Sequence, residues 1–303
     1  HFLVLGRFYR AYGTFNQPNP FGGFMNLTAV LALGLFLNYL PDLWSSRKIK
    51  SQRRNFQELA AVWLPLLGVG GVTAVSLLAV IFSWSRGAWL SLAAATAVLL
   101  FFWPRRLWQG ALLLFLGTGL LLVSIQAGLL PDSLADRITG FGEDLRFGDV
   151  RGEDINDDNY AVLERLAHWQ AAVDMAEDHP WFGVGFGNYE PAYADYALIN
   201  WPYPLGHAHN YYLNLLAETG IVGLVGYLLL WTAVFWQTVG ALRQSEGWRR
   251  GVALGLLGVW VAISVHHLVD KLYVNNIYIQ LGVLFGLLQI VAADPKAPDK
   301  IST

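Results

Sequence analysis

The chain alternates between long apolar stretches and short polar connections, a pattern that predicts membrane-spanning helices. A helix needs about 20 mainly apolar residues to cross a hydrocarbon core of roughly 30 Å. Residues 1–20 contain Pro18 and Pro20, which cannot sit inside a helix, so this segment is predicted to lie outside the membrane. The predicted fold is an all-α polytopic membrane protein, a single membrane domain over residues 1–303 with about seven transmembrane helices. The predicted spans are about 21–39, 59–84, 88–103, 107–126, 211–239, 251–268 and 277–292.

A long polar loop, about 128–210, interrupts the apolar pattern. Its acidic run from Glu143 to Asp158 lacks the regular alternation and closing Glu of a calcium loop, so we interpret it as a solvated linker. Residues 160–177 have amphipathic helical spacing, which predicts a surface helix lying on the membrane face. The glycines of residues 183–187 lack the strand–turn–helix context of a dinucleotide motif and are interpreted as a hinge.

Composition supports the membrane class and excludes several others. Hydrophobic residues make up 55% of the chain and charged residues 14%, and the 13 Trp, 13 Tyr and 17 Phe supply anchors for two water–lipid boundaries. A net charge of -2 argues against a nucleic-acid partner, because no basic face is available to neutralise the phosphates of a nucleic acid over a long footprint. The absence of Cys excludes disulfides and thiolate metal sites.

Basic residues predict the orientation, because short cytoplasmic loops retain Lys and Arg. Most of the 20 basic residues follow the first, third, fifth and seventh spans, beginning with a basic loop at 47–54. The other basic residues that follow these spans are Arg105, Arg106, Arg243, Arg249, Arg250, Lys296 and Lys300, which with the five of the loop make 12 of the 20. The loop of residues 128–210 is therefore predicted to face outward, on the periplasmic side.

Candidate chemistry lies at the mouth of the fifth span, where His207, His209 and Asn210 precede the apolar stretch. Polar side chains are costly at such a position and are usually functional. The predicted topology places the unusual polar residues on the same outer side. They are Asn19, Arg86, Arg165, His207, His209, Asn210, His266, Asp270 and Lys271. Two arginines can bind a phosphate or pyrophosphate, with a histidine as general base.

Simpler roles are open for several of these residues. His209 would also suit an interfacial histidine satisfied by the backbone or by lipid headgroups, and His207 is expected mainly to shape the turn. Arg86 at a helix end can be a snorkelling residue. Arg165 lies beside Glu164, and an exposed ion pair would explain both.

Two further groups carry supporting expectations. His266, His267 and Asp270 include an i, i+4 pair able to bind a metal, but no third ligand is evident, so a hydrogen-bonded structural pair and no metal site are predicted. Glu218 lies within the fifth span and is predicted to face a protein or water-filled interior, either to support the site or to bond between helices.

A series of short motifs resembles the O-antigen ligase and O-antigen polymerase superfamily of bacterial cell-envelope proteins, over nearly the whole chain from Gly13 to Asp270. The motifs are Gly13-Thr14-Phe15 with Pro18-Asn19-Pro20, Ser85-Arg86-Gly87-Ala88-Trp89, Arg165 with Trp169, residues 179–185, His209-Asn210 followed by Gly220-Ile-Val-Gly223, and residues 266–270. Members usually carry further helices upstream, so the resemblance implies the C-terminal part of a longer, GT-C-like architecture.

The resemblance implies a metal-independent, inverting glycosyltransferase without a cofactor. Such an enzyme transfers a glycan from undecaprenyl pyrophosphate to lipid A core, protein or a growing glycan, at the outer face of the bacterial cytoplasmic (inner) membrane. His209 matches the catalytic histidine, and Arg86 and Arg165 match the arginines that hold the pyrophosphate. Asn210, His207 and Asn19 are expected to bind substrate, and His266, Asp270 and Glu218 to support the site.

Three alternatives remain at this stage. A polymerase that extends the repeat is not separated from a ligase. Some relatives carry the label of bicarbonate carriers, although transport sites normally lie near the bilayer midplane, whereas the polar residues here gather at one face. A non-catalytic remnant is the third alternative, favoured by the missing upstream helices.

Overall fold

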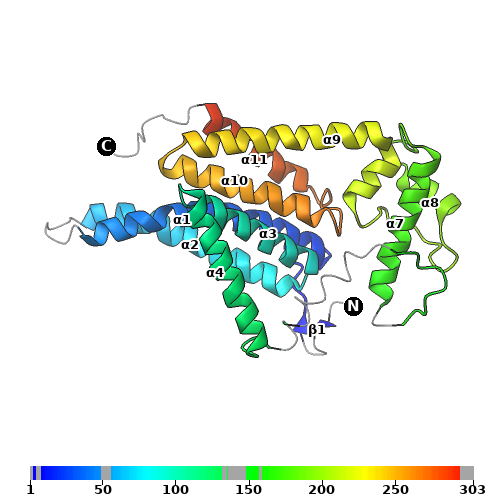
Figure 1. Cartoon of the computed structure of the whole chain (residues 1–303), viewed down its shortest axis with the longest axis horizontal. Coiled ribbons are helices and arrows are strands. Elements are labelled where there is room, and N and C mark those ends of the chain that lie inside the picture. The colour runs from blue at the N-terminus through cyan, green and yellow to red at the C-terminus, as the bar shows by residue number, and fades with distance from the viewer. Residues whose placement is uncertain are drawn as a thin grey trace. The chain divides into compact units, whose positions relative to one another are not determined.

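The computed structural model describes residues 3–4, 8–48, 56–131, 135, 148–156 and 159–293. Within them the chain forms nine α-helices and one antiparallel pair of two-residue strands (Figure 1). The elements are β1 (Leu3–Val4), β2 (Phe8–Tyr9), α1 (Pro18–Lys48), α2 (Phe56–Ser83), α3 (Arg86–Phe102), α4 (Leu107–Gln126), α7 (Tyr160–Asp178), α8 (Tyr189–Tyr196), α9 (Tyr211–Gln244), α10 (Gly247–His266) and α11 (Ile277–Ala293). Most of the predicted basic loop, part of the acidic run and the basic tail lie outside the described residues.

Five helices of the described part are long and apolar enough to cross a membrane, which makes this a helical membrane protein. They are Pro18–Leu40, Trp63–Ser83, Leu107–Gln126, Tyr211–Gln244 and Gly247–His266, and each coincides with a predicted span. The stretches predicted at 88–103 and 277–292 are also helical, as α3 and α11, but each has only 17 residues. That these two cross the membrane stays a prediction.

The surfaces of α2 and α4 fit a lipid environment. Only 22% of the apolar window in α2 and 6% of that in α4 is buried, and side chains such as Leu64 and Phe115 are exposed. A water-soluble monomer rarely exposes contiguous apolar surface of this extent. The exposed surfaces of α2 and α4 are therefore suited to contact with lipid.

The N-terminal region differs from the prediction in two ways. Helix α1 begins at Pro18, so the expectation that Pro18 and Pro20 lie outside a helix was wrong. Proline is tolerated in a first helical turn, because the N–H that it lacks has no intrahelical partner there. The small β1–β2 pair was not foreseen by the all-α prediction.

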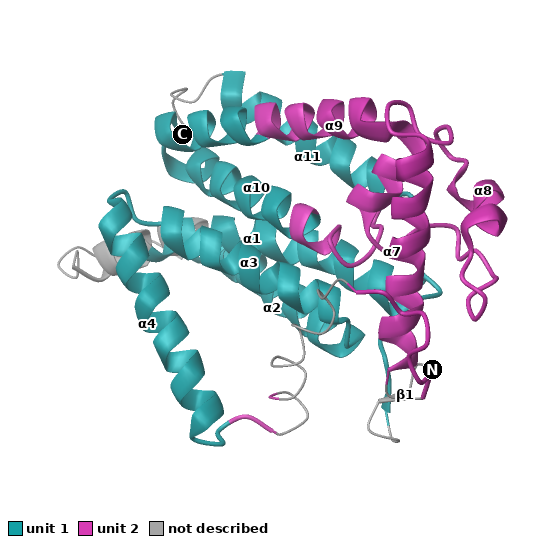
Figure 2. Cartoon of the chain, turned by 45° about the vertical axis from the view of Figure 1, so that its right-hand side comes forward, with its two compact units in different colours: residues 1–129, 235–263, 273–303 teal, residues 130–234, 264–272 magenta. Residues whose placement is uncertain are grey.

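The chain divides into two compact units (Figure 2), each of which is described by itself. Unit 1 comprises residues 1–129, 235–263 and 273–303, and unit 2 comprises residues 130–234 and 264–272. The prediction of one continuous membrane domain stays a prediction.

Small residues allow close helix packing in unit 1. A Cβ on Gly34 of α1 would overlap the backbone nitrogen of Gly255 in α10, so these two backbones lie in direct contact. Between α1 and α3, the buried Asn26 Nδ2 donates to Ser91 Oγ at 2.8 Å. Such a bond satisfies polar groups that would be costly in an apolar interior.

Helix α7 organises unit 2. The predicted helix at 160–177 is confirmed, but its apolar side is buried in the unit rather than left for a lipid surface, which corrects the surface-helix interpretation. Most buried residues of α7 belong to two hydrophobic clusters, together with residues from other parts of unit 2. One contains Ala171, Ala172, Met175, Tyr189, Tyr193, Ala208 and Ala217, and the other contains Val150, Leu163, Leu166, Ala167, Trp169 and Trp201.

Helix α9 is broken at Gly220, whose φ of 63° and ψ of -167° are not helical. Such a break leaves carbonyl groups without intrahelical partners. The backbone N–H groups of Val184 and Gly185 donate to the carbonyls of Ala217 and Glu218, each at 2.9 Å. The glycine-rich segment therefore satisfies the last turn before the break.

The same segment also satisfies the first turn after the break. The N–H groups of Ile221 and Val222 donate to the carbonyls of Pro180 and Trp181, at 2.8 and 3.3 Å. A Cβ on Gly183 would overlap the α9 backbone, so glycine is needed here for close approach. A segment fixed by these bonds is a packed backbone cover, and its interpretation as a hinge was wrong.

Candidate active site

The loop before α9 holds its histidines on a constrained backbone. Gly206 and His209 both have positive φ, of 78° and 53°, and the conformation is uncommon for a residue with a side chain. Asn210 follows, and its Oδ1 accepts hydrogen bonds from the N–H groups of Tyr212 and Leu213 at 3.0 and 3.2 Å. The sequence predicted a substrate-binding role for Asn210, and the structure gives its side-chain oxygen the role of helix cap.

Two more bonds fix this loop. The Ala208 N–H donates to Asn214 Oδ1 at 3.1 Å, and the Tyr211 N–H donates to the carbonyl of His267 at 2.8 Å. A positive φ at a non-glycine residue costs about 1–3 kcal/mol and persists only where surrounding contacts enforce it. The loop therefore holds His209 in a strained backbone conformation, a feature that is typical of functional sites.

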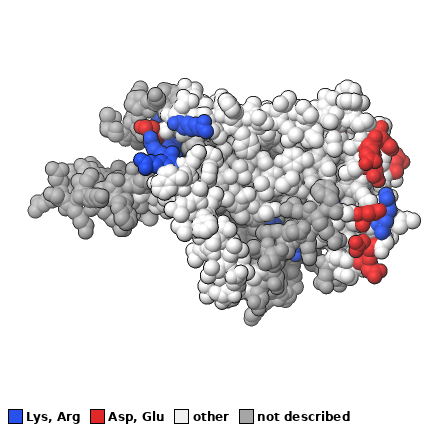
Figure 3. Space-filling view, in the orientation of Figure 1, with Lys and Arg blue, Asp and Glu red and all other residues white. Residues whose placement is uncertain are grey.

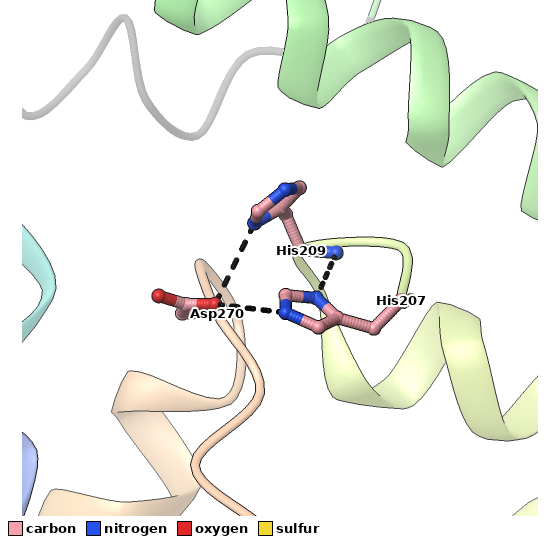
Figure 4. Close-up of side chains that lie close together, drawn as sticks. All are labelled: His207, His209 and Asp270. Carbon is pink, nitrogen blue, oxygen red and sulfur yellow. Dashed lines mark hydrogen bonds and ion pairs between the residues drawn. The ribbon is translucent and has the colours of Figure 1, made fainter. Parts of the chain in front are cut away.

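Asp270, from the segment that follows α10, lies beside both loop histidines (Figure 4). Its Oδ1 is 3.5 Å from His209 Nδ1 and 3.9 Å from His207 Nε2, and it accepts a hydrogen bond from the Lys271 N–H at 2.8 Å. The imidazole centroids are 4.4 Å apart, with the rings tilted by 70°. The structure thus groups His207, His209 and Asp270, which the sequence had placed only on a common face.

Hydrogen bonding indicates where the protons are. His207 Nδ1 accepts from the His209 N–H at 3.1 Å, so a neutral His207 carries its proton on Nε2, on the Asp270 side. In His209 the Nδ1 nitrogen faces Asp270, which favours a proton there and leaves Nε2 as the basic nitrogen. His209 Nε2 is buried and has no hydrogen-bond partner among the described residues. A carboxylate that orients an imidazole in this way prepares it to accept a proton.

The charges in this group are set by burial and by mutual contact. Burial lowers the pKa of His207 to about 4, against the opposing charge of Asp270, so His207 is neutral at pH 7. Burial alone would raise the pKa of Asp270, but the contact with His209 and the neighbouring histidine charges hold that pKa well below its usual range. Because His207 is uncharged near neutrality, His209 is the main partner of the ionised carboxylate.

The donor set of this group also raises the question of a metal. His207, His209 and Asp270 offer ligand atoms within 4.8 Å of one another, of the kinds that bind zinc. A metal-bound histidine normally donates its second N–H to a neighbour. His207 Nδ1 instead faces the backbone N–H of His209, which leaves no lone pair on Nε2 of the neutral ring. The arrangement therefore fits a proton better than a metal ion.

His168 of α7 joins this group and was missed by the sequence analysis. Its buried ring stacks on Tyr193, with centroids 4.6 Å apart, and meets the His209 ring edge-on at 5.8 Å. Tyr189 Oη lies 3.0 Å from His168 Nδ1 and donates to the His168 carbonyl at 3.1 Å, which places the His168 proton on Nδ1. Burial, with smaller contributions from His209 and His207, lowers the pKa of His168 to about 3. His168 is thus a neutral support beside His209.

Glu218 and Arg165, both predicted site residues, also belong to unit 2. The buried Glu218 Oε1 accepts from the Tyr189 N–H at 3.3 Å, where a carboxylate favourably meets the N-terminus of α8. Arg165 of α7 is half-buried, and its charge acts on the imidazole of His266, another residue of unit 2. Asp270 acts on the same ring, so the fold associates Arg165, His266 and Asp270 electrostatically.

Arg86 and Asn19 belong to unit 1. Arg86 is the first residue of α3, after an N-cap in which the Ala88 N–H donates to Ser85 Oγ at 3.4 Å. A helix N-terminus and an arginine both favour an anion. Asn19 lies in the first turn of α1, and its Oδ1 accepts from Arg10 Nη2 at 2.9 Å. The predicted places of Arg86 and Asn19 beside His209 stay predictions.

A helical membrane protein that holds a carboxylate against an imidazole on a strained loop is equipped for proton transfer. A family model described as O-antigen ligase matches residues 71–228, just over half of the chain, so the protein belongs to the O-antigen ligase family, as the motifs predicted. The matched segment includes Arg86, Arg165 and His209 and ends before Asp270. No match was found among the curated proteins with which the chain was compared.

Proposed function

We propose that the protein is an O-antigen ligase-like glycosyltransferase, which moves a glycan from undecaprenyl pyrophosphate to an acceptor at the outer face of the bacterial cytoplasmic membrane. The observation that carries this proposal is the pairing of Asp270 with His209 on a loop of fixed conformation. Membership of the O-antigen ligase family supplies the substrate class, a lipid-linked glycan.

In the proposed reaction the acceptor hydroxyl gives its proton to His209 Nε2 as its oxygen attacks the anomeric carbon of the donor. The bond between that carbon and the pyrophosphate oxygen breaks, and its electron pair leaves with undecaprenyl pyrophosphate. Direct displacement inverts the anomeric centre. The ionised Asp270 stabilises the imidazolium that forms on His209, at a contact of 3.5 Å.

The leaving group is the second charge to be stabilised. We assign this role to Arg86 and Arg165, because guanidinium groups bind phosphate oxygens in a bidentate manner and keep their charge. The position of Arg86 at the start of α3 adds helix N–H groups that also favour an anion. Two arginines in these roles require no metal ion.

Access to His209 is part of the proposal. Because Nε2 is buried, the side chains that cover it must move before an acceptor hydroxyl can reach it. His168 and Tyr193 form one side of its surroundings through their stacked rings. The acceptor hydroxyl would then supply the hydrogen bond that Nε2 lacks.

The break in α9 bears on the transporter alternative, since transport sites are often built on broken helices. Here the carbonyls of Ala217 and Glu218 each already accept a hydrogen bond, from Val184 and Gly185, so they are weaker ligands for an ion than unpaired carbonyls would be. The pairing favours the transferase. A polymerase differs from a ligase in the acceptor that it uses. The experiment therefore offers each acceptor separately.

The test uses the purified protein in nanodiscs with an undecaprenyl pyrophosphate-linked glycan. Lipid A core, a protein acceptor and a growing glycan are offered separately, and release of undecaprenyl pyrophosphate is measured. His209→Ala should lower turnover by roughly 10²–10⁴-fold with donor binding nearly kept, and His207→Ala should do much less. Near-normal turnover by correctly inserted His209→Ala protein would show that His209 is not the base.

A further inference from the structure

A groove of about 630 Å³ lies in unit 2, lined by α7, α8 and the chain segments beside them. Its lining shares no residue with the group of His207, His209 and Asp270. The apolar part includes the buried Val150 and Trp201, and Ile199 is 95% exposed. The volume is within the range of sites that hold small ligands.

Hydrogen-bonding groups line the rest of this groove. Arg151 Nη2 lies 3.8 Å from Asp174 Oδ2, a loose ion pair whose side chains are 60% and 38% exposed. Both partners therefore keep donors and acceptors for a ligand. Asp195 and Asn200 add an exposed carboxylate and an exposed amide. Figure 3 shows acidic side chains gathered with a few basic atoms over α7 and α8.

The charge of the groove limits what it can bind. Asp174 and Asp195 line it, Asp149 lies beside it in contact with Arg151 at 3.6 Å, and among the described residues of the lining Arg151 is the one basic residue. The described part of the groove thus has three carboxylates against one guanidinium, a negative balance that disfavours phosphate. The groove is therefore unsuited to the pyrophosphate of the donor.

The apolar wall is held rigidly before any ligand arrives. The Trp201 carbonyl accepts a hydrogen bond from Tyr193 Oη at 2.9 Å, and its ring packs against Tyr160 with centroids 4.9 Å apart. Val150 belongs to the same buried cluster. A site that is already ordered loses little entropy when it binds a ligand.

We propose that this groove is a subsite for hydroxyl-rich, uncharged sugar units of the glycan, an inference that rests on the proposed function. A sugar ring has C–H faces that suit Val150 and Ile199. Its hydroxyl groups at the edge suit carboxylate, amide and guanidinium groups, such as those of Asp195, Asn200 and Arg151. The same chemistry would hold either the donor glycan or the acceptor glycan.

The groove and the candidate base share one framework. Tyr193 bonds to the Trp201 carbonyl and stacks on His168, whose ring meets His209 edge-on. A glycan in the groove would thus contact Trp201, which Tyr193 links to the side chains beside the base. Contacts between the glycan and the groove would be equally strong in the ground state and in the transition state. Such contacts lower KM and leave kcat nearly unchanged.

The experiment measures glycan binding by the full chain in nanodiscs, with two probes: the glycan released from the donor lipid and the oligosaccharide released from lipid A core. Asp195→Asn, which removes the charge from a hydrogen-bond acceptor, should weaken binding of one probe by about tenfold, and Asn200→Ala, which removes a neutral amide, by about fivefold. The probe that is affected identifies the source. Glu177→Gln, an exposed carboxylate on α7 outside the groove, is the matched control and should have no effect.

Binding is also measured with His209→Ala protein, so that the groove is tested without turnover. Sugar binding that is kept in this variant and lost in Asp195→Asn supports the subsite, even if no lipid-linked glycan is ever transferred. Equal binding by Asp195→Asn, Asn200→Ala and the control would overturn the subsite while leaving the transferase intact. Preferential binding of a lysine-rich peptide over both glycans would overturn it as well.

Discussion

The contact between Asp270 and His209 leads to the most informative prediction. Asp270→Asn keeps the size of the side chain and removes its charge, so an imidazolium on His209 loses its partner. At 3.5 Å and an effective dielectric constant of about 20, this attraction is worth about 4.7 kcal/mol. Because the amide dipole recovers part of that, we expect kcat to fall on the order of 10³-fold, at about 1.4 kcal/mol per factor of ten.

The assay follows release of undecaprenyl pyrophosphate at saturating donor, with Glu177→Gln as the control for an exposed carboxylate of α7. The double variant Asp270→Asn, His209→Gln decides whether the two residues act as a unit. If they do, the double variant should be no slower than His209→Gln alone, because the carboxylate acts only through the imidazole.

Two results would refute this reasoning. One is Asp270→Asn protein, inserted and folded as judged by size exclusion, that turns over within a few-fold of the parent protein. The other is a double variant whose loss is the product of the two single losses, because independent residues multiply their effects.

Three further predictions address charge, metal and orientation. Arg86→Lys and Arg165→Lys should weaken donor binding and turnover together, since lysine keeps the charge but loses the bidentate fork; unchanged kinetics would remove the arginines from the site. Chelators should leave transfer intact, and activity that is lost in chelator and restored by magnesium or manganese would contradict this. A cysteine at Asn156 should react only with reagents added outside, and one at Gln244 only from the cytoplasm; the reverse labelling would invert the topology.

The sequence predicted the helices well because apolar length is a local property. The span at 107–126 coincides with α4, and α7 was foreseen from its spacing to within a residue. The break at Gly220 was not foreseen, since its glycine lies in an apolar run that is compatible with a continuous helix. The backbone bonds with residues 180–181 and 184–185 satisfy the polar groups at the break, and these bonds depend on tertiary structure.

The sequence predicted most residues of the candidate site but not their spatial arrangement. His209 and Asp270 were both named, but the 3.5 Å contact joins the loop before α9 to the segment after α10, which no local pattern specifies. His168 was passed over because it lies within the apolar spacing of α7, where a histidine resembles core. The sequence signal that could have identified His168 was a titratable side chain on the apolar face of the predicted helix.

The break in α9 also has a consequence for biosynthesis. The carbonyls of Ala217 and Glu218 would each cost several kcal/mol if they met hydrocarbon without partners. Their donors at residues 184–185 precede α9 in the chain, so the ribosome releases the cover before it releases the helix that needs it. A circular permutation that moved residues 179–185 behind α9 would present an uncovered break to the insertion machinery, and we expect such a chain to insert poorly although every native contact remained possible.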